Sequence, residues 1–464
     1  MLEAAYLDAA RSLIAADSVT DRGNLRAVQV LEPLCGDAGL IPTRLPSPDT
    51  ADRDANLLAG PGGGPGAVGD PLLLVTHLDT VDPGPREHWR TDPFSLEVQG
   101  DRAFGLGVAD VKLDALCKLW AARRLKGVAL RRPFYFLGTY GEEAGLRGAR
   151  AFMEAPPFRP SVVLCGEPSE LRICHAHKGY AVARVTIRRR AGTAFAAAPA
   201  RIIAFEGKAA HSSTPHLGVN AIDAALEALS RPGAPYVMHL SGGASANTIP
   251  ARCEAVVYWR PGCVPSPAWT EPVGASMPPE NSWANVTDML PLVKELRVSW
   301  TSRVMSMVPA SDSRFAPATA VANLTRVSTT GSTLDVTFDA RLLPGHDVEA
   351  LVTGFEQDAI ARSDAAFEVR VAIDRRASGM SLAEDAPLVR TCGEVLERLG
   401  LSGAPKAKPT STEAGVFARA GIPAIVFGPS LSTGNAHTAN EHARLDEVER
   451  AVEVYERFIR ALCA

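Results

Sequence analysis

The sequence lacks a long uncharged apolar run, a block of basic residues and a secretory signal, and each absence excludes a class of protein. A membrane-spanning helix takes about 20 mostly apolar residues in a row, so none is expected here. Residues 1–20 give an amphipathic, partly acidic helical pattern without the basic start of a secretory signal. With a formal net charge of -4 and no basic stripe, neither a nucleic acid nor a membrane is an expected partner.

Paired cysteines are missing as well. The eight cysteines are scattered along the chain, and no two of them form a CxxC motif. Because no export signal precedes them, we expect reduced thiols in a cytoplasmic protein.

The pattern of helical and extended segments predicts two domains, which is also the expectation for 464 residues. In residues 1–180 and again in 378–464, short apolar runs alternate with helical patterns. This alternation predicts an α/β fold in which helices cover both faces of a mostly parallel sheet. Residues 181–377 combine strand patterns with two helices, which predicts an inserted α+β domain. Two stretches, 191–200 and about 261–323, fit neither pattern, and the longer one is expected to carry a local function or contact.

One predicted strand ends in two polar residues that share a face. The segment LLLVTHLDTVDPG, residues 72–84, places His77 and Asp79 two positions apart, and alternate residues of a strand point to the same side. The simpler interpretation is a hydrogen-bonded pair at a strand end. The alternative is that His77 binds a metal and that Asp79 orients its ring, which requires further ligands elsewhere in the chain.

Further candidate ligands follow other predicted strands and turns: Asp110, Glu142, Glu143, Glu167 and His437. Each acidic residue has an ordinary explanation by itself, since such residues also cap helices or favour helix N-termini. Together, however, they stand at strand ends of a doubly covered sheet, where such folds place their sites. Two histidines and three carboxylates suit two zinc ions that share one carboxylate, with Glu142 left free to act as a base.

The order of these motifs resembles the co-catalytic zinc metallopeptidases, which include acetylornithine deacetylase, succinyl-diaminopimelate desuccinylase, aminoacylase and glutamate carboxypeptidase. The resemblance covers nearly the whole chain and is carried by HLDTV, GLGVADVK, GTYGEEAG, GEPSE, HKGY, HSSTPHLGVNAI, GGASANTIP, DARLLPG, TEAGVFARAGIP and AHTANE. It implies a zinc-exopeptidase-like fold whose inserted domain serves as a lid and dimerisation domain. One departure is Leu106, where the family usually has an arginine.

The resemblance also implies a role for each candidate residue of the first domain. One zinc ion would be held by His77 and Glu167 and the second by Glu143 and His437, with Asp110 bridging both. Asp79 would orient His77, and Glu142 would be the general base. The expected cofactor is therefore two zinc ions per subunit, for which cobalt or manganese can substitute.

In the inserted domain, the resemblance implies that His211, Asn247 and Arg341 contact the substrate. On the sequence alone, His211 suits a capping or packing role before a helix that begins near Pro215. The resemblance instead implies a homodimer in which His211 reaches the active site of the neighbouring subunit. Arg260 also follows Asn247 at a plausible spacing, and it is the alternative to Arg341, whose DARLLPG context matches the family.

The expected function is that of a di-zinc hydrolase that cleaves the amide bond of a small N-acyl amino acid, similar to acetylornithine deacetylase. Zinc would lower the pKa of bound water, and Glu142 would accept the proton and pass it to the leaving amine. Glu167, where the family's aminopeptidase branch has Asp, favours a deacylase or a carboxypeptidase. The alternatives are a dipeptidase or carboxypeptidase of the same family and, in another class, a catalytically idle metal-binding scaffold.

Overall fold

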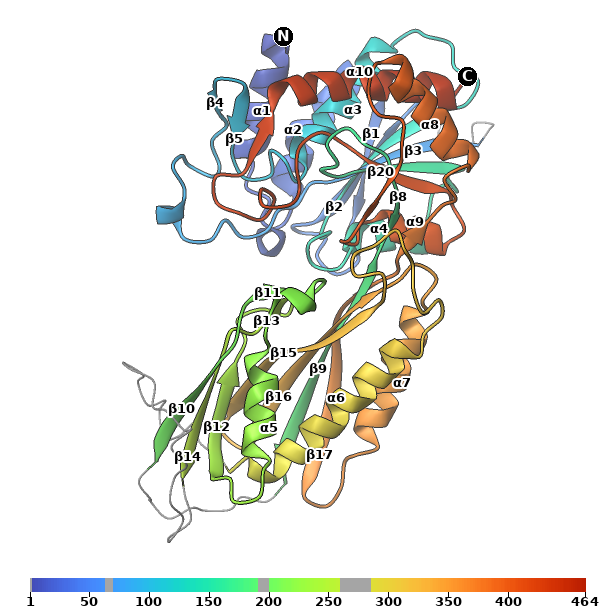
Figure 1. Cartoon of the computed structure of the whole chain (residues 1–464). Helices are drawn as coiled ribbons and strands as arrows, with labels where there is room; N and C mark the ends of the chain where they lie inside the picture. Colours follow the sequence, from blue (N-terminus) through green and yellow to red (C-terminus); the bar gives the residue numbers. More distant parts are fainter. Residues whose placement is uncertain (1, 63–69, 191–199, 259–284) are drawn as a thin grey trace. The chain divides into compact units, whose positions relative to one another are not determined.

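The chain divides into two compact units, each with its own core. A computed structural model describes residues 2–62, 70–190, 200–258 and 285–464. Unit 1 comprises residues 1–177 and 380–464, and unit 2 comprises residues 178–379. In Figure 1, both coloured ends of the chain, blue and red, belong to unit 1, whereas the green to light orange middle belongs to unit 2. The sequence had predicted an inserted segment over residues 181–377.

Unit 1 is built on a nine-stranded mixed sheet. Its central strands run parallel in the order β6 (Phe134–Thr139), β3 (Leu72–His77), β7 (Val162–Gly166) and β20 (Ala424–Phe427). The outer strands are β2 (Ala55–Gly60) and β1 (Ile41–Pro46) at one edge, and β8 (Cys174–His177), β18 (Met380–Ser381) and β19 (Lys406–Lys408) at the other. Except for β19, these outer strands pair antiparallel. The predicted α/β fold is confirmed, and its parallel part is the centre of the sheet.

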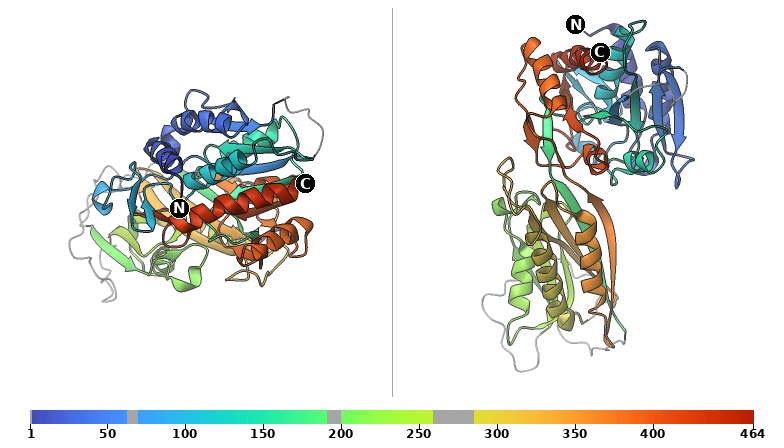
Figure 2. Two further views of the ribbon diagram at one scale, coloured as in Figure 1. Left: turned by 90° about the horizontal axis from the view of Figure 1, so that it is seen from above. Right: turned by 90° about the vertical axis from the view of Figure 1, so that its right-hand side faces the viewer.

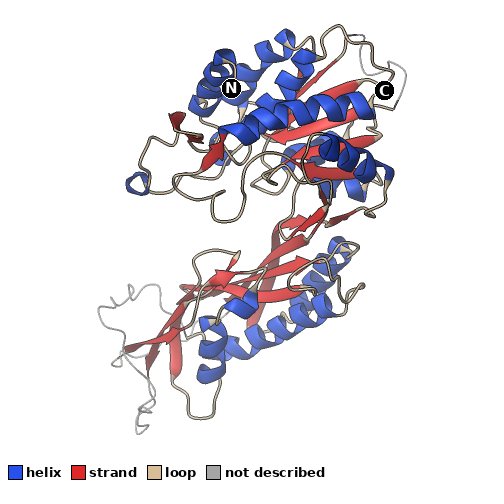
Figure 3. Cartoon of the chain, turned by 45° about the horizontal axis from the view of Figure 1, so that its top comes forward, coloured by secondary structure: helices blue, strands red, loops and turns tan. Residues whose placement is uncertain are grey.

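Helices cover both faces of this sheet, as the alternation of side chains in β3 shows. Leu72 and Leu74 pack on one face with α1 (Ala4–Ala15), α2 (Leu25–Asp37), α3 (Lys112–Arg124), α8 (Pro387–Arg398) and α10 (Leu445–Leu462). Leu73 and Val75 pack on the opposite face with α4 (Arg147–Glu154) and α9 (Ala414–Arg419). Figure 3 shows these helices in blue flanking the red strands. Burial on both faces explains why the central strands are continuously apolar.

A small three-stranded sheet joins two distant parts of unit 1. It consists of β4 (Glu97–Gln99), β5 (Arg102–Phe104) and β21 (His442–Arg444). β21 pairs antiparallel with β5, so that His442 lies opposite Phe104. This pairing brings the loop that precedes β21 next to the turn that precedes α3, and both segments carry predicted metal ligands.

Unit 2 is a layer of helices packed on an antiparallel sheet. The strand order is β10 (Arg201–Glu206), β14 (Arg252–Tyr258), β12 (Tyr236–Gly242), β15 (Val321–Thr330), β16 (Thr333–Leu342), β9 (Gly179–Arg189) and β17 (Phe367–Ala377). The helices are α5 (Ala221–Leu229), α6 (Leu290–Met305) and α7 (Val348–Ile360). Figures 1 and 2 show α6 and α7 lying side by side along the sheet. This is the α+β arrangement that the sequence predicted for the inserted domain.

The end of the 261–323 stretch, which fitted neither pattern in the sequence, contributes to the core of unit 2. Trp300 of α6 is fully buried and meets the Phe355 ring edge-on at a centroid distance of 4.8 Å. Val293, Leu296 and Val304 lie on the same buried face, which gives the 3–4 residue spacing of an amphipathic helix. Residues 259–284, like 191–199, lie outside the described part of the chain.

Two further expectations concern the chain as a whole. Within the described ranges, no helix combines the length and apolar character that crossing a membrane requires. The cysteines that the structure describes are all buried free thiols: Cys35, Cys117, Cys165, Cys174, Cys253, Cys392 and Cys463. Cys263 lies outside the described residues.

Candidate active site and metal centre

His77 ends β3 with its imidazole enclosed, since only 1% of the residue is exposed. Its Nδ1 lies 3.1 Å from the backbone carbonyl oxygen of Asp79. A carbonyl oxygen only accepts hydrogen bonds, so Nδ1 carries a proton and donates it. The other ring nitrogen, Nε2, lies 3.1 Å from Oδ1 of Asp110. The imidazole is therefore oriented with Nε2 toward the candidate metal centre, as a ligand requires.

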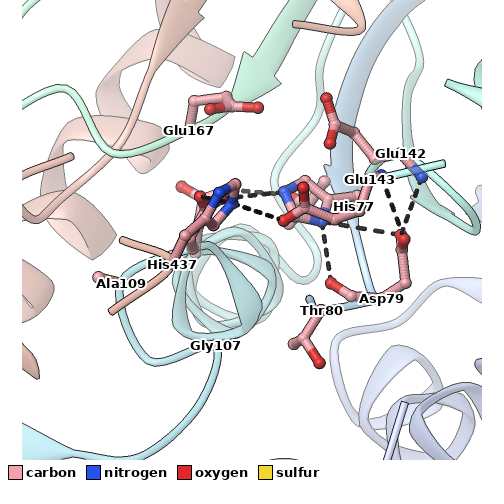
Figure 4. A network of polar contacts seen from close by, with 12 residues as sticks. His77, Asp79, Thr80, Gly107, Ala109, Glu142, Glu143, Glu167 and His437 are labelled. Atoms are coloured by element: carbon pink, nitrogen blue, oxygen red, sulfur yellow. Dashed lines mark hydrogen bonds and ion pairs between the residues drawn. The ribbon is translucent and has the colours of Figure 1, made fainter. Parts of the chain in front are cut away.

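The Asp79 carboxylate lies farther from the His77 ring than the Asp79 carbonyl does, at 3.8 Å from Nδ1. Its hydrogen bonds are made to other groups. Its Oδ1 accepts from the backbone N–H of Glu142 at 3.0 Å, and its Oδ2 accepts from that of Glu143 at 3.3 Å. The Thr20 hydroxyl donates to the same Oδ2 at 2.7 Å. Figure 4 shows dashed lines from the Asp79 carboxylate to the backbone of Glu142 and Glu143. Asp79 therefore contacts the His77 ring through its carbonyl and holds the Glu142–Glu143 turn through its carboxylate.

Asp110 lies between the two candidate ligand histidines and offers one carboxylate oxygen to each. Oδ1 faces His77 Nε2 at 3.1 Å, and Oδ2 faces His437 Nε2 at 3.3 Å. Oε1 of Glu143 lies 2.8 Å from the same His437 nitrogen. The five predicted ligands thus form two groups that share Asp110: His77, Asp110 and Glu167, and Asp110, Glu143 and His437. Within each group the potential ligand atoms lie within 4.8 Å of one another.

These residues suit a divalent metal in their chemistry and in their spacing. Bonds of about 2.0–2.2 Å from one tetrahedral zinc to imidazole nitrogen and carboxylate oxygen put those atoms roughly 3.3 Å apart. The nitrogen-to-oxygen distances from Asp110 to His77 and to His437 are 3.1 and 3.3 Å. Imidazole with carboxylate is also a usual donor set for zinc.

Charge repulsion and burial shift the pKa values of this cluster. Burial raises the pKa of Glu142 well above its usual value, and neighbouring carboxylates such as Glu143 add to the rise. Burial by itself would lower the pKa of His437, but hydrogen bonds to Asp110 and Glu143 outweigh it and raise the pKa to about 11. Burial also raises the pKa of Glu167. Carboxylates gathered away from water are costly without a cation, so the cluster favours binding of positive charge.

A buried glutamate shapes the turn that carries Asp110. Glu441 is 1% exposed, and its carboxylate accepts the backbone N–H groups of Gly107, Ala109 and Asp110 at 3.0, 2.7 and 2.9 Å. Glu441 lies directly after the loop that carries His437. Its carboxylate therefore connects this loop to the turn that carries Asp110.

A lysine contacts one of the predicted metal ligands. Lys408, the last residue of β19, donates from Nζ to Oε2 of Glu167 at 2.5 Å, and both side chains are buried. Burial would lower the pKa of Lys408, but the charges of Glu167 and Asp110 raise it. Lys408 is therefore a charged ammonium group within the candidate metal centre.

Another buried acid lies behind the cluster. Glu413 is 3% exposed, and its Oε1 accepts no hydrogen bond from any described residue. Burial raises the pKa of Glu413 to about 7. The charge of His77 lowers this pKa, and that of Asp79 raises it further. Glu413 is therefore only partly ionised near neutral pH, and it is not one of the predicted ligands of the centre.

Beneath the strand ends, a buried ion pair fixes their positions. Lys118 and Asp114 of α3 lie 2.7 Å apart and are fully enclosed. Lys118 donates to the Thr76 hydroxyl at 2.7 Å, next to His77, and the Tyr455 hydroxyl donates to Asp114 at 2.5 Å. A methyl group at Gly166, the residue before Glu167, would lie 1.9 Å from an Asp114 oxygen. Only glycine leaves room there for the pair.

In unit 2, the three predicted substrate residues are connected through Ser212. His211 ends the short strand β11 (Ala210–His211), opposite Thr248 of β13 (Thr248–Ile249). The next residue, Ser212, donates its backbone N–H to the Asn247 carbonyl at 2.8 Å and accepts from Arg341 Nε at 3.2 Å. His211, Asn247 and Arg341 are thus held in one part of unit 2, and their roles stay predictions.

Arg341 has a buried anionic partner of its own. Its Nη2 lies 3.1 Å from Oδ2 of the fully buried Asp339. The alternative substrate residue, Arg260, lies outside the described part of the chain.

Four residues of the centre were not selected from the sequence: Thr20, Lys408, Glu413 and Glu441. Glu413 and Glu441 stand inside the motifs TEAG and AHTANE, so the motif match could have indicated them. Lys408 and Thr20 give no comparable signal, because their importance depends on contacts with residues far away in the sequence.

Comparison with known proteins agrees with this geometry. A family model described as peptidase family M20/M25/M40 matches residues 73–461. The acetylornithine deacetylase of Edwardsiella ictaluri is 32% identical over 275 residues, which cover 55% of this chain and 66% of that protein. The enzyme of the same name from Yersinia pseudotuberculosis is 34% identical over 278 residues with the same coverage. The chain thus spans slightly less than two thirds of the length of these curated relatives.

Solved structures agree at the level of the fold. Aminoacylhistidine dipeptidase from Vibrio alginolyticus gives a TM-score of 0.67 at 15% identity, covering 99% of this chain and 97% of that one. An M20 family metallo-carboxypeptidase from Sulfolobus solfataricus gives 0.62 at 16% identity, covering 99% of each chain. The resemblance drawn from the sequence is confirmed: the chain belongs to peptidase family M20/M25/M40.

Proposed function

We propose that the protein is a metal-dependent amide hydrolase that uses two zinc ions per subunit to deacylate a small N-acyl amino acid. The observation that carries the proposal is the Asp110 carboxylate, which presents one oxygen to His77 and the other to His437. A shared carboxylate with a separate histidine and glutamate on each side is a donor set for two ions rather than one. Cobalt or manganese in place of zinc would use the same donors.

The bound ions would supply a lowered pKa for water and a positive charge for the amide oxygen. Glu142 would accept the proton of the attacking water and deliver it to the leaving nitrogen. Two features suit it to this role: its backbone is fixed by the hydrogen bond to Asp79, and burial raises its pKa well above the usual value. A carboxylate with a raised pKa is a stronger base near neutral pH.

The substrate would be held by the residues around Ser212 in unit 2. A guanidinium such as Arg341 suits the carboxylate of an N-acyl amino acid. His211 and Asn247 would donate hydrogen bonds to the amide oxygen, where negative charge develops. Similarity to acetylornithine deacetylases favours a deacylase over other members of the family.

The second candidate is a dipeptidase or carboxypeptidase. It is supported by the names of the structurally similar proteins, an aminoacylhistidine dipeptidase and a metallo-carboxypeptidase. A catalytically idle metal-binding scaffold is the third, and the presence of Glu142 beside a complete donor set argues against it. Turnover of any amide substrate by the metal-loaded protein would exclude the scaffold.

The test is a substrate panel. N-acetyl, N-succinyl and N-formyl amino acids and a set of dipeptides would be incubated with the protein and added zinc or cobalt, and release of the free amine would be measured. Preference for acyl amino acids supports the deacylase, and preference for dipeptides supports the alternative. No turnover on any member, with metal shown to be bound, would contradict the proposal.

A homodimer in which His211 serves the neighbouring active site extends the proposal. Subunits carrying His211→Ala and subunits carrying Glu142→Ala, each inactive by itself, would be mixed and allowed to exchange. In a mixed dimer, one active site receives both intact groups, so activity should return. If activity stays absent after proven subunit exchange, His211 does not act in trans.

A further inference from the structure

The contact between Lys408 and Glu167 has no role in the chemistry proposed above. Lys408 Nζ lies 2.5 Å from Oε2 of Glu167, and only 9% and 8% of the two side chains are exposed. A buried ammonium is costly unless it is paired, and Glu167 is also a member of the metal-binding group of His77 and Asp110. One carboxylate thus has two candidate cationic partners, the lysine and a metal ion.

The two partners oppose each other for electrostatic reasons. While Lys408 donates to Oε2, part of the negative charge of Glu167 is neutralised, so Glu167 is a weaker donor toward a metal. A divalent ion beside Glu167 also faces the fixed positive charge of the ammonium group. In a buried site, where the effective dielectric constant is about 20 or below, such repulsion over a few ångströms exceeds what a tenfold change in affinity requires.

We propose that Lys408 is a resident counter-ion of the His77 group, which stabilises the metal-free site and selectively weakens metal binding there. In the metal-free protein it neutralises part of the negative charge of Glu167 and Asp110. In the metal-bound protein it draws negative charge away from the ion at Glu167 and repels the ion. The inference rests on the proposed metal centre, and it concerns the His77 group rather than the group of Glu143 and His437.

The test measures zinc affinity and metal-free stability in the same variants. Zinc alone would be titrated calorimetrically, against a competing chelator, into the metal-free full-length chain. Lys408→Gln removes the charge and keeps a hydrogen-bond donor for Glu167. It should tighten the zinc-binding step that depends on His77 at least tenfold, and it should lower the urea midpoint of the metal-free protein.

The opposite signs separate this role from a merely structural one. A lysine that only shaped the site would, when replaced, lower both stability and zinc affinity. The His77 step would be isolated in a His437→Ala background and the other step in a His77→Ala background. Lys408→Gln should act strongly in the first background and by less than threefold in the second.

The chain provides a matched control on the same strand. Lys406 also belongs to β19 and pairs with a glutamate, Glu170, at 3.2 Å, but this pair is partly exposed. Lys406→Gln removes the same charge without touching Glu167 and should change zinc affinity by less than twofold. Lys408→Met removes the charge at similar volume and should also tighten the His77 step, which covers the case in which Lys408→Gln does not fold, whereas Lys408→Arg keeps the charge and should not tighten it.

Each outcome decides one point. An unchanged or weakened His77 step in Lys408→Gln overturns the inference, as does an equal gain in Lys406→Gln. A tighter His77 step with lower metal-free stability supports it. If the unmodified chain binds no zinc, the proposed function fails together with the inference, and that result is distinct from an insensitive Lys408.

Discussion

The two halves of the candidate metal centre, which meet at Asp110, differ in how the fold holds them. The inner half contains His77, at the end of a strand paired on both sides, with a side chain 1% exposed. The outer half contains His437, in a loop with φ 59° and a side chain 48% exposed. The inner ligand is therefore fixed by the sheet, whereas the outer ligand is fixed by its loop and by the groups that it contacts.

This difference indicates a division of labour. Residues on buried strands keep their geometry at little cost, and residues on exposed loops are reached by water and substrate. The inner half therefore suits a metal site of fixed geometry. The outer half is the side open to solvent, and Glu142, the proposed base, is next to the outer candidate ligand Glu143.

The largest expected effect separates the role of the proposed base from that of the neighbouring metal ligand. Glu142→Gln should retain metal and lose roughly two to four orders of magnitude in turnover, which is the usual contribution of a general base. Glu143→Gln, one residue away, should instead weaken metal binding. Metal content and turnover would be measured for both variants. If the two variants behave alike in both assays, the assignment of base and ligand is wrong.

The second prediction tests the inner and outer halves by stability. His77→Ala should destabilise the metal-free protein by about 3–5 kcal/mol, because it leaves the buried Asp110 without one of its cationic partners. His437→Ala also removes a partner of Asp110 but should cost only about 1 kcal/mol, because its side chain is 48% exposed and water can take its place beside Asp110 and Glu143. Urea denaturation in the presence of chelator would measure both. Equal losses would mean that the two halves do not differ in rigidity.

The third prediction concerns Glu413, the buried acid next to the inner half. The pKa of Glu413 is raised from 4.5 to about 7 in the folded protein. Its contribution to stability is therefore fully present below pH 4.5 and is lost as the pH rises toward 7, by up to about 3 kcal/mol. Glu413→Gln should remove this dependence, so the metal-free variant should gain stability over the unmodified protein between these pH values. A parallel pH profile for both proteins would contradict the assignment.

Sequence reasoning was most informative where local pattern and chemistry coincide. The apolar runs that end in His77 and Glu167 predicted buried strands with polar ends, and only the set of such ends together favoured a metal site over a hydrogen-bonded pair. The alternation of strands and helices similarly predicted the α/β fold of unit 1. The antiparallel edges were missed, since the direction of a strand is set by its connections rather than by its own residues.

The supporting contacts could not be predicted, for physical reasons. The partners Thr20 and Asp79, like Lys408 and Glu167, are far apart in the sequence and meet only after folding. The contact of Asp79 with the Glu142–Glu143 turn runs through backbone N–H groups, which carry no sequence signal. Helix α6 illustrates another limit, because the surrounding Pro- and Ser-rich composition masked the apolar spacing of Val293, Leu296 and Trp300.

The smallest predicted effect concerns Asp79, the residue that contacts both halves of the centre. Asp79 contacts His77 on the inner side and holds the Glu142–Glu143 turn on the outer side, and the Thr20 hydroxyl donates to its Oδ2 at 2.7 Å. Thr20→Val removes that bond at nearly constant volume, which should cost about 1 kcal/mol. Because Asp79 serves both sides, we expect a roughly fivefold loss of turnover and similar losses of zinc affinity in the two binding steps. Thr20→Ser, which keeps the hydroxyl, is the control. A loss confined to one binding step would mean that Asp79 positions only that half of the centre.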